Sequence, residues 1–255
     1  MLDAFHALPF TPLDWSLMLV AIAIAYIVFG IAGFGTALVA GPLLIRLMPL
    51  SQVIPLLVLL DFIAAFGNLL PSRQAVVGRE LLKLLPCMAL GCTLGVVFLL
   101  RLQSDRLLLL MGLFLVAYAI YMLAVKVKPA RLPALWSIPM GTVGGLFGAL
   151  FGSGGFLYAI YLSARLEDKQ QVRATQSALI SCSTLVRLTL FIVAGVYADF
   201  RLLALAICLL PAMASGLWLG RRLTLRMSRE AFVRLVTWLV LASGVTLLYR
   251  YFSGL

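Results

Sequence analysis

Charged side chains are scarce in this sequence. Only 11% of its 255 residues are Asp, Glu, Lys or Arg, whereas 64% are hydrophobic. A soluble domain carries about 25% charged and about 45–50% apolar residues, so a soluble protein is excluded. Apolar segments close to the roughly 17–25 residues needed to cross a bilayer recur along the whole chain. The sequence therefore predicts an integral membrane protein with short loops and no separate water-soluble domain.

Groups for metal binding and covalent catalysis are also rare. The single histidine, His6, lies in the N-terminal tail, and the four cysteines form no C-x-x-C pair. No apolar segment carries a His/Glu or paired-acid motif, so a membrane-embedded enzyme would lack its reacting groups. A nucleotide-binding G-x4-G-K-[ST] loop is missing as well. We expect neither an enzyme nor a bound metal or cofactor.

The net charge of +11 does not indicate a nucleic-acid partner. The basic residues fall in short clusters between apolar segments, which is typical of the inner loops of membrane proteins. We count ten apolar segments, at 15–32, 34–48, 51–70, 81–100, 107–125, 134–150, 152–163, 174–197, 201–220 and 231–250. The segments 34–48 and 152–163 are short for full spans, so half-helices and re-entrant arms are both open.

The positive charges predict an orientation. If the N-terminus is outside and each segment crosses once, 13 basic residues lie on the inner side and 5 on the outer side. The inner residues are Arg73, Arg79, Lys83, Lys126, Lys128, Arg131, Arg165, Lys169, Arg173, Arg221, Arg222, Arg226 and Arg229. The outer residues are Arg46, Arg101, Arg106, Arg201 and Arg250. This is the bias that the positive-inside rule describes.

An internal repeat divides the chain in two. Pro86-x4-Gly91-x3-Gly95 matches Pro211-x4-Gly216-x3-Gly220, and small residues at this spacing predict close helix packing. Each half holds five segments, an odd number, so the halves must be inverted relative to each other. We predict one all-α membrane domain of two inverted repeats, at 1–125 and 134–255, joined by a linker at 126–133.

Two glycine clusters interrupt apolar segments, one in each half. They are Gly30-Ile-Ala-Gly33-Phe-Gly35-Thr36 and Gly148-Ala-Leu-Phe-Gly152-Ser153-Gly154-Gly155. Broken helices in corresponding places of two halves are typical of a transporter's binding site. Helix N-termini at the breaks offer N–H groups to an anion, and Thr36 and Ser153 add hydroxyl donors. Close packing through small residues is the alternative. The candidate substrate-binding residues here are Gly33, Gly35, Thr36, Gly152, Ser153, Gly154 and Gly155.

Arg187 is the sharpest single candidate, since it lies well inside an apolar segment. A charge there costs about 2.5–3.5 kcal/mol on insertion scales and marks a functional site by default. Its guanidinium is a planar fork of donors that suits an oxyanion. Gln176 and Thr184 share its helix face, so we add both to the substrate site. Structural pairing with Asp61 and snorkelling to the membrane surface are the alternatives for Arg187.

Three further residues are candidates for coupling or gating. Asp61 is the one acid well within an apolar segment, where it takes up a proton during transport or pairs with Arg187. Arg173 lies on the polar stripe of Arg187. Tyr158 and Tyr161 follow the second glycine cluster, and each either lines a cavity or anchors the chain at the membrane interface. Of these two we assign Tyr161 to gating.

The motifs together resemble the TauE/SafE sulfite exporter family. Its first signature is similar to Gly33-Phe-Gly35-Thr36-Ala37-x4-Pro42, and its second to the stretch from Gly144-Gly145 through Gly152-Ser-Gly154-Gly155 to Tyr161-Leu162. Arg173-Ala-Thr175 and Leu185-Val-Arg187-Leu are similar to the segments that follow. Thr36, Ala37 and Tyr161 depart from the family pattern, where glycines and a proline are common. The resemblance implies secondary transport of a small sulfur-containing anion.

We therefore expect a multi-pass secondary transporter of the inner cell membrane that moves sulfite, a sulfonate or a related organic anion by alternating access. The direction expected is export. A passive anion channel is the main alternative, and a membrane-embedded enzyme is a weaker one. The expected partners are the small anion and membrane lipid, with other copies of the same chain as an open alternative. The cluster from Arg221 to Arg229 is typical of an inner loop that faces anionic lipid.

Overall fold

The computed structural model describes residues 11–69, 74–102, 104–124, 132–198 and 200–224, and within the C-terminal tail 237–238, 241–242, 244–249 and 251–252. These residues form helices joined by short connections, with no strand among them. The helices are α2 Pro12–Ala32, α3 Thr36–Leu44, α4 Leu50–Leu69, α5 Gly78–Arg101, α6 Ser104–Ala124, α7 Ser137–Phe151, α8 Gly155–Arg165, α9 Lys169–Val193 and α10 Phe200–Thr224. Short 3-10 turns at Ala134–Trp136 and Val196–Ala198 precede α7 and α10.

The helices agree with the first nine apolar segments of the sequence. Six stretches of them are long and apolar enough to cross a bilayer: Pro12–Ile31, Leu50–Gly67, Gly78–Arg101, Ala134–Phe151, Gln170–Val193 and Phe200–Leu223. The chain is thus a multi-pass membrane protein. Half of the predicted segment 231–250 falls outside the described residues, and so does the linker 126–133 except for 132–133. The count of ten crossings stays a prediction.

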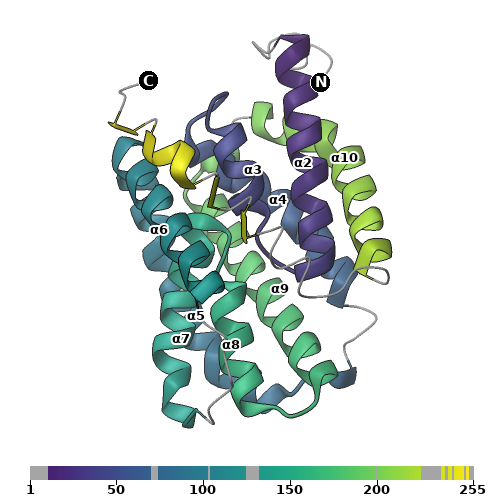
Figure 1. Ribbon diagram of the computed structural model, residues 1–255, viewed down its shortest axis with the longest axis vertical. Helices are drawn as coiled ribbons and strands as arrows, with labels where there is room; N and C mark the ends of the chain where they lie inside the picture. Colours follow the sequence, from purple (N-terminus) through teal and green to yellow (C-terminus); the bar gives the residue numbers. More distant parts are fainter. Residues whose placement is uncertain are drawn as a thin grey trace.

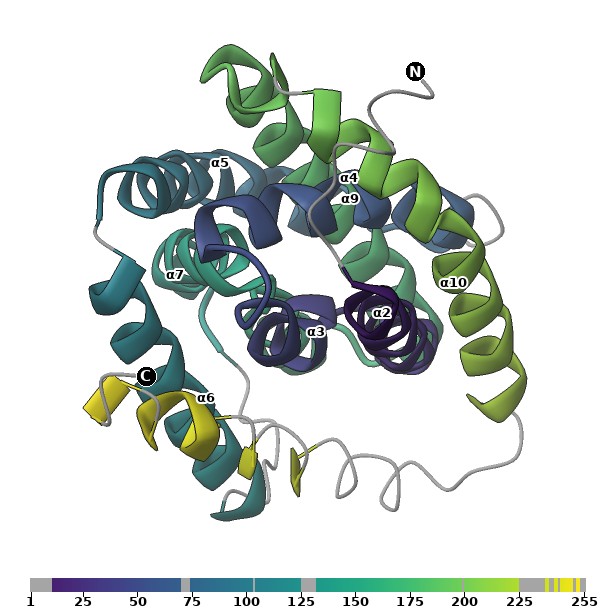
Figure 2. The ribbon, with the colours of Figure 1, turned by 90° about the horizontal axis from the view of Figure 1, so that it is seen from above.

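Both glycine clusters break the helices where the sequence predicts. Gly33 and Gly35 have φ angles of 80° and 96° between α2 and α3, and Gly152 has a φ of 61° between α7 and α8. These left-handed conformations favour glycine because it lacks a Cβ. At about 1.5 Å per residue, the nine residues of α3 and the eleven of α8 are too short to span a bilayer. Each short helix packs beside the helix before it (Figures 1 and 2).

The repeated proline–glycine motif is a packing motif, as its spacing predicts. A methyl group on Gly91 would collide with the backbone of Thr142 in α7. A methyl group on Gly216 or Gly220 would collide with the backbone of Ala23 or Ile27 in α2. The fourth helix of each half therefore packs against the first helix of the other half, α5 on α7 and α10 on α2.

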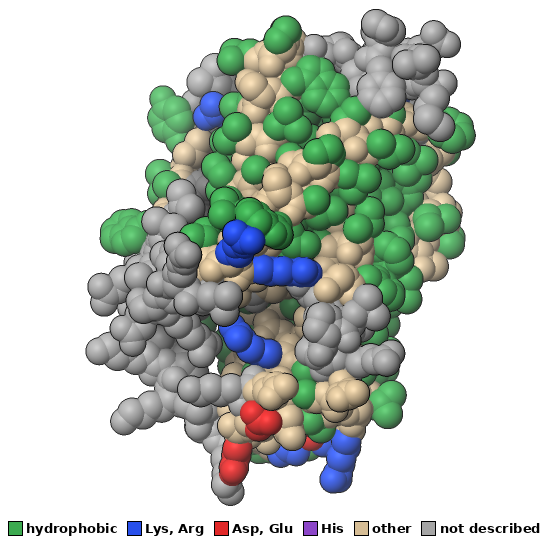
Figure 3. Space-filling model, turned by 90° about the vertical axis from the view of Figure 1, so that its right-hand side faces the viewer, with side chains coloured by type: hydrophobic (Ala, Val, Ile, Leu, Met, Phe, Trp, Pro, Cys, Tyr) green, Lys and Arg blue, Asp and Glu red, His purple; other side chains and the backbone are tan. Residues whose placement is uncertain are grey.

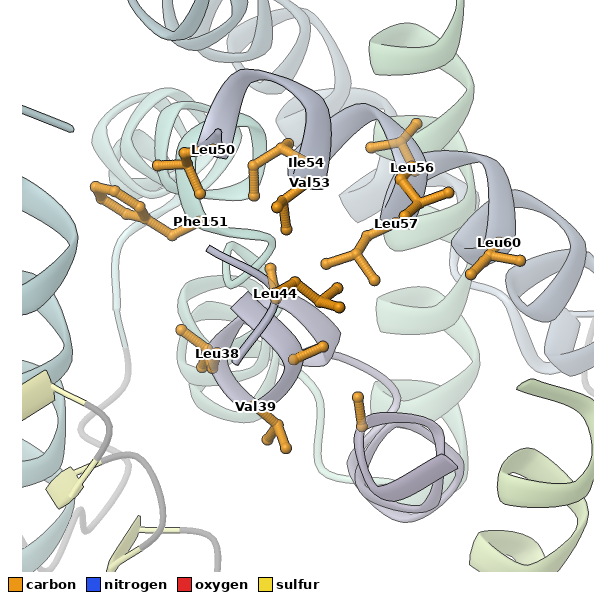
Figure 4. Packing of buried hydrophobic residues seen from close by; sticks show 14 of the residues in the cluster. Leu38, Val39, Leu44, Leu50, Val53, Ile54, Leu56, Leu57, Leu60 and Phe151 are labelled. Atoms are coloured by element: carbon orange, nitrogen blue, oxygen red, sulfur yellow. The ribbon is translucent and has the colours of Figure 1, made fainter. Parts of the chain in front are cut away.

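The two hairpins, α2–α3 and α7–α8, lie toward opposite ends of the long axis in Figure 1. Helices α4 and α9 pack against each other and join them. Figure 4 shows Leu44 of α3 beside Leu57 of α4 in the core between these elements, whereas Leu38 points away from Leu57. Towards the outside, large side chains of α10 are exposed, including Phe200, Ile207 and Trp218. Hydrophobic side chains likewise cover the upper part of the face in Figure 3, whereas charged ones gather lower down.

Candidate functional site

A small cavity lies where the two glycine breaks meet. Its volume is about 20 Å³, room for a particle of about the size of one water. Its lining comes from both halves of the chain: Phe29, Phe34, Gly35 and Asp61 from the first, and Gly148, Gly152, Gly154, Gly155, Tyr158, Ile180, Ser183 and Arg187 from the second. The sequence predicts four of the glycines and both charged residues. It gives no signal for the apolar members, which look like ordinary core residues.

Arg187 brings the positive charge to this cavity, and its side chain is only 4% exposed. Its Nη1 donates to the carbonyl oxygen of Gly148 at 2.8 Å, and its Nη2 donates to the Thr184 hydroxyl at 3.0 Å. Its Nε donates to the Ser183 carbonyl at 3.3 Å. These bonds hold the guanidinium inside the protein at the second break, so it does not snorkel to the surface.

Asp61 brings the negative charge from α4 and is also 4% exposed. Its Oδ1 accepts a hydrogen bond from the Tyr26 hydroxyl at 2.7 Å, and its Oδ2 accepts one from the Thr36 hydroxyl at 3.1 Å. Tyr26 belongs to α2 and Thr36 begins α3, so both donors come from the first break. The role of Tyr26 has no signal in the sequence, where a tyrosine in an apolar segment looks like a packing residue.

The two charges face the same cavity without forming an ion pair. Asp61 and Arg187 are both described by the structure, and no nitrogen of one lies within 4.0 Å of an oxygen of the other. Their charges still act on each other across the cavity. The arrangement leaves a guanidinium and a carboxylate on the walls of one buried space. An anion that enters meets an attractive group and a repulsive group together.

Two hydroxyls near the cavity have no hydrogen-bond partner. Ser153, between the glycines of the second break, and Tyr158, on the cavity wall, bury their oxygen atoms with none in range. Tyr158 has Ser183 as a neighbour, but without hydrogen-bond geometry. Buried polar groups are nearly always paired, and an orphan marks a place for a missing partner. Tyr158 was an open candidate from sequence, and the structure places it on the wall.

The other candidates of the glycine clusters and of α9 lie around the cavity rather than on its wall. Gly33 forms the turn after α2 and has open space at the position of a Cβ. Thr184 is buried and supports Arg187 from the next turn of α9. Gln176 is half-buried and donates from Nε2 to the Gly155 carbonyl at 3.1 Å, which ties α9 to the start of α8. Arg173 is exposed and is not a lining residue.

Tyr161 belongs to a second polar cluster, centred on Glu80 at the start of α5. Its hydroxyl donates to Glu80 Oε2 at 2.9 Å, while Lys83 Nζ and Arg165 Nη2 donate to Oε1 at 2.7 and 3.2 Å. Glu80 is 5% exposed. Close by, the N–H of Val77 donates to the Thr175 hydroxyl at 2.9 Å. This cluster links α5 of the first half to α8 of the second. Glu80, which lies beside a basic loop, has no signal in the sequence that points to this role.

A comparison with models of protein families matches residues 17–247 to the family described as Sulfite exporter TauE/SafE. Neither the curated proteins nor the solved structures contain a significant match. The match covers nearly the whole chain, including both glycine breaks, Asp61 and Arg187. It agrees with the resemblance of the glycine motifs and with the set of membrane-crossing helices. The chain belongs to the TauE/SafE sulfite exporter family.

Proposed function

We propose that this protein is a secondary transporter that carries a small sulfur-containing anion, such as sulfite or a sulfonate, outward across the inner cell membrane. The observation that carries the proposal is the cavity between the two glycine breaks, with Arg187 on its wall. A transporter family described as sulfite exporters supports the class of substrate and the direction.

The cavity offers donors that suit an oxyanion. Arg187 holds its guanidinium with carbonyl and hydroxyl acceptors that an anion can replace or share. Tyr158 and Ser153 add two hydroxyls that lack partners. Helix α8 begins at Gly155, whose N–H group has no partner within the helix, whereas the N–H groups of Phe156 and Leu157 donate to the Ser153 and Gly154 carbonyls at 3.5 and 3.2 Å. Together these groups can surround the oxygens of a sulfite or sulfonate with charge-assisted hydrogen bonds.

Alternating access is the mechanism that we propose for the movement. The reciprocal packing of α5 on α7 and of α10 on α2 supports two inverted halves, 1–125 and 134–255. A cavity of about 20 Å³ is too small for an oxyanion, so the two hairpins must move apart to admit one. The Glu80 cluster ties α5 to α8 away from the cavity, and we assign Tyr161 to a gate that opens when this cluster separates.

The test is a binding screen followed by counterflow. Purified protein is titrated with sulfite, thiosulfate, sulfate and methanesulfonate, and the anions that bind are then tested in proteoliposomes. Saturable uptake of labelled anion that is stimulated by unlabelled anion inside supports a carrier. A conductance that does not saturate supports a channel instead. Binding of none of these anions contradicts the proposed substrate class.

A further inference from the structure

We propose that the anion binds together with one proton, and that Asp61 is the residue that takes up this proton. The inference rests on the proposed function and deepens it, because it names a second species carried by the same cavity. Its basis is the pair of buried charges on the cavity wall, which balance each other only while no anion is present.

The charge balance is the first step. Without an anion, the carboxylate of Asp61 and the guanidinium of Arg187 sum to zero across the cavity. A bound anion adds at least one negative charge that this pair does not compensate, between two side chains that are each only 4% exposed. Uncompensated charge is costly in a protein interior within the membrane. One proton from the aqueous phase, bound to a carboxylate oxygen of Asp61, removes the excess charge of a monovalent anion.

The hydrogen bonds around Asp61 accommodate both forms of the side chain. When Asp61 is ionised, Tyr26 donates to Oδ1 at 2.7 Å. The same hydroxyl lies 3.5 Å from the Leu57 carbonyl oxygen. When Oδ1 carries a proton, Asp61 can donate to the Tyr26 oxygen while Tyr26 turns its own hydrogen to Leu57. Thr36 can donate to Oδ2 in either form. The hydroxyls of Tyr26 and Thr36 and the proton of Asp61 therefore have an acceptor in either state.

No other titratable group described around Asp61 is placed to take its role. Tyr26 from α2 and Arg187 from α9 are the charged or titratable groups that act on it, and Thr36 comes from α3. On α10, which also packs on α4, Arg221 lies against Gly67, more than a turn further along α4. After α9, Tyr197 donates to the Pro55 carbonyl, also more than a turn away.

The proton changes the energetics of transport. A monovalent anion and a proton move with no net charge, so the membrane potential neither helps nor hinders them. Export is then driven by the concentration gradients of the anion and the proton together, so an outward anion gradient must exceed any opposing pH gradient. A divalent anion with one proton still carries one negative charge, and its export gains about 2.3 kcal/mol per 100 mV. For either anion, linkage requires the apparent affinity to fall as pH rises, by up to about tenfold per pH unit once Asp61 is ionised in the free protein.

Proton uptake on binding tests the proposal. Purified protein in weakly buffered detergent solution is mixed with saturating thiosulfate or methanesulfonate, and a pH indicator reports the protons bound. These two anions do not take up a proton near neutral pH themselves. We expect about one proton per anion in the natural protein and none in Asp61→Asn. The matched control is Asp168→Asn, which removes an exposed acid at the start of α9 and should keep the uptake.

Anion binding without proton uptake in the natural protein overturns the inference and leaves the proposed function standing. Proton uptake that persists in Asp61→Asn also overturns it, since the proton then binds elsewhere. If Asp61→Asn does not fold, the natural protein still shows whether a proton binds with the anion. Tyr26→Phe then tests where the proton binds, because an unchanged pH dependence of proton uptake in that variant contradicts binding at Asp61. Failure of every anion in the screen to bind contradicts the proposed function itself.

Discussion

Two carboxylates are buried among the described residues, and they are held in opposite ways. Glu80 is surrounded by cations, with Lys83 and Arg165 on one oxygen and Tyr161 on the other. Asp61 accepts only from the neutral hydroxyls of Tyr26 and Thr36 and faces Arg187 without an ion pair. A carboxylate fixed by two cations stays ionised and joins two helices. One fixed by hydroxyls can change its charge, and it is this one that borders the cavity.

Removing the cation of the cavity should have the largest effect on anion binding. Arg187→Ala deletes the buried group that attracts the anion and leaves Asp61 without a counter-charge. Losing one partner of a buried charged contact costs about 2–5 kcal/mol, so the dissociation constant for the anion should rise at least about 30-fold. Binding to purified protein measures it, and counterflow should disappear with it.

The control for Arg187→Ala is Arg173→Ala, which removes an exposed arginine from the same helix. It should bind the anion as the natural protein does. Normal binding by Arg187→Ala, with expression unchanged, would show that the cavity is not the substrate site. Arg187→Lys keeps the charge but loses the planar fork, and we expect an affinity between those of the other two variants.

Neutralising the other carboxylate should change stability rather than binding. Glu80→Gln removes the charge shared by Lys83 and Arg165, whose side chains are 26% and 30% exposed. Ion pairs that are partly buried contribute about 1–3 kcal/mol to stability, more than exposed pairs and less than fully buried ones. The thermal midpoint of unfolding should therefore fall. Anion affinity at equilibrium should change less than about twofold. A large loss of affinity with unchanged thermal stability would remove the distinction between the two carboxylates.

The sequence predicts the parts of the site that follow from local chemistry. Glycine is the residue that tolerates a positive φ, so Gly35 and Gly152 mark the breaks before any contact is known. Arg187 is costly in an apolar segment and is therefore visible. Along the predicted stripe of α9, Thr184 supports Arg187 whereas Arg173 is exposed.

What the sequence misses depends on contacts between distant residues. Tyr161 lies 81 positions from Glu80, and Arg165 lies 85 positions from it. From the sequence, Glu80 looks like a charged loop residue. Its burial and its contacts with α8 arise only when the chain is folded. From the sequence, Tyr26 looks like a packing residue of an apolar segment. The partner of its hydroxyl, Asp61, lies 35 positions away in the chain and is brought to it only by the fold. Apart from Lys83, which lies three residues after Glu80 in the same helix, the groups that hold the two carboxylates are therefore brought to them by the fold.

Tyr26→Phe tests how a hydroxyl donor affects the charge of Asp61, because it removes the shorter of the two hydrogen bonds to this carboxylate. The ionised carboxylate loses a hydrogen bond to a charged group, worth about 1.5–3 kcal/mol, and the protonated form loses a neutral one, worth about 0.5–1.5 kcal/mol. The protonated form is thus favoured by about 1 kcal/mol, close to one pH unit. The pH at which anion affinity begins to fall should move up by about that amount. Tyr118→Phe, which changes a buried tyrosine of α6 outside the cavity lining, should leave it in place.

Thr36→Val is the finest test, since it removes one hydroxyl and keeps the shape of the side chain. The Thr36 bond to Asp61 is 3.1 Å long, against 2.7 Å for the Tyr26 bond, and longer charge-assisted bonds are weaker. We expect the pH dependence of anion affinity to move up by about half a pH unit or less, and Thr36→Ser to restore it. Thr93→Val, at an exposed position of α5, is the control. A downward shift in Thr36→Val would mean that the hydroxyl stabilises the protonated acid, and Asp61 would then resemble a permanently neutral group rather than one that alternates.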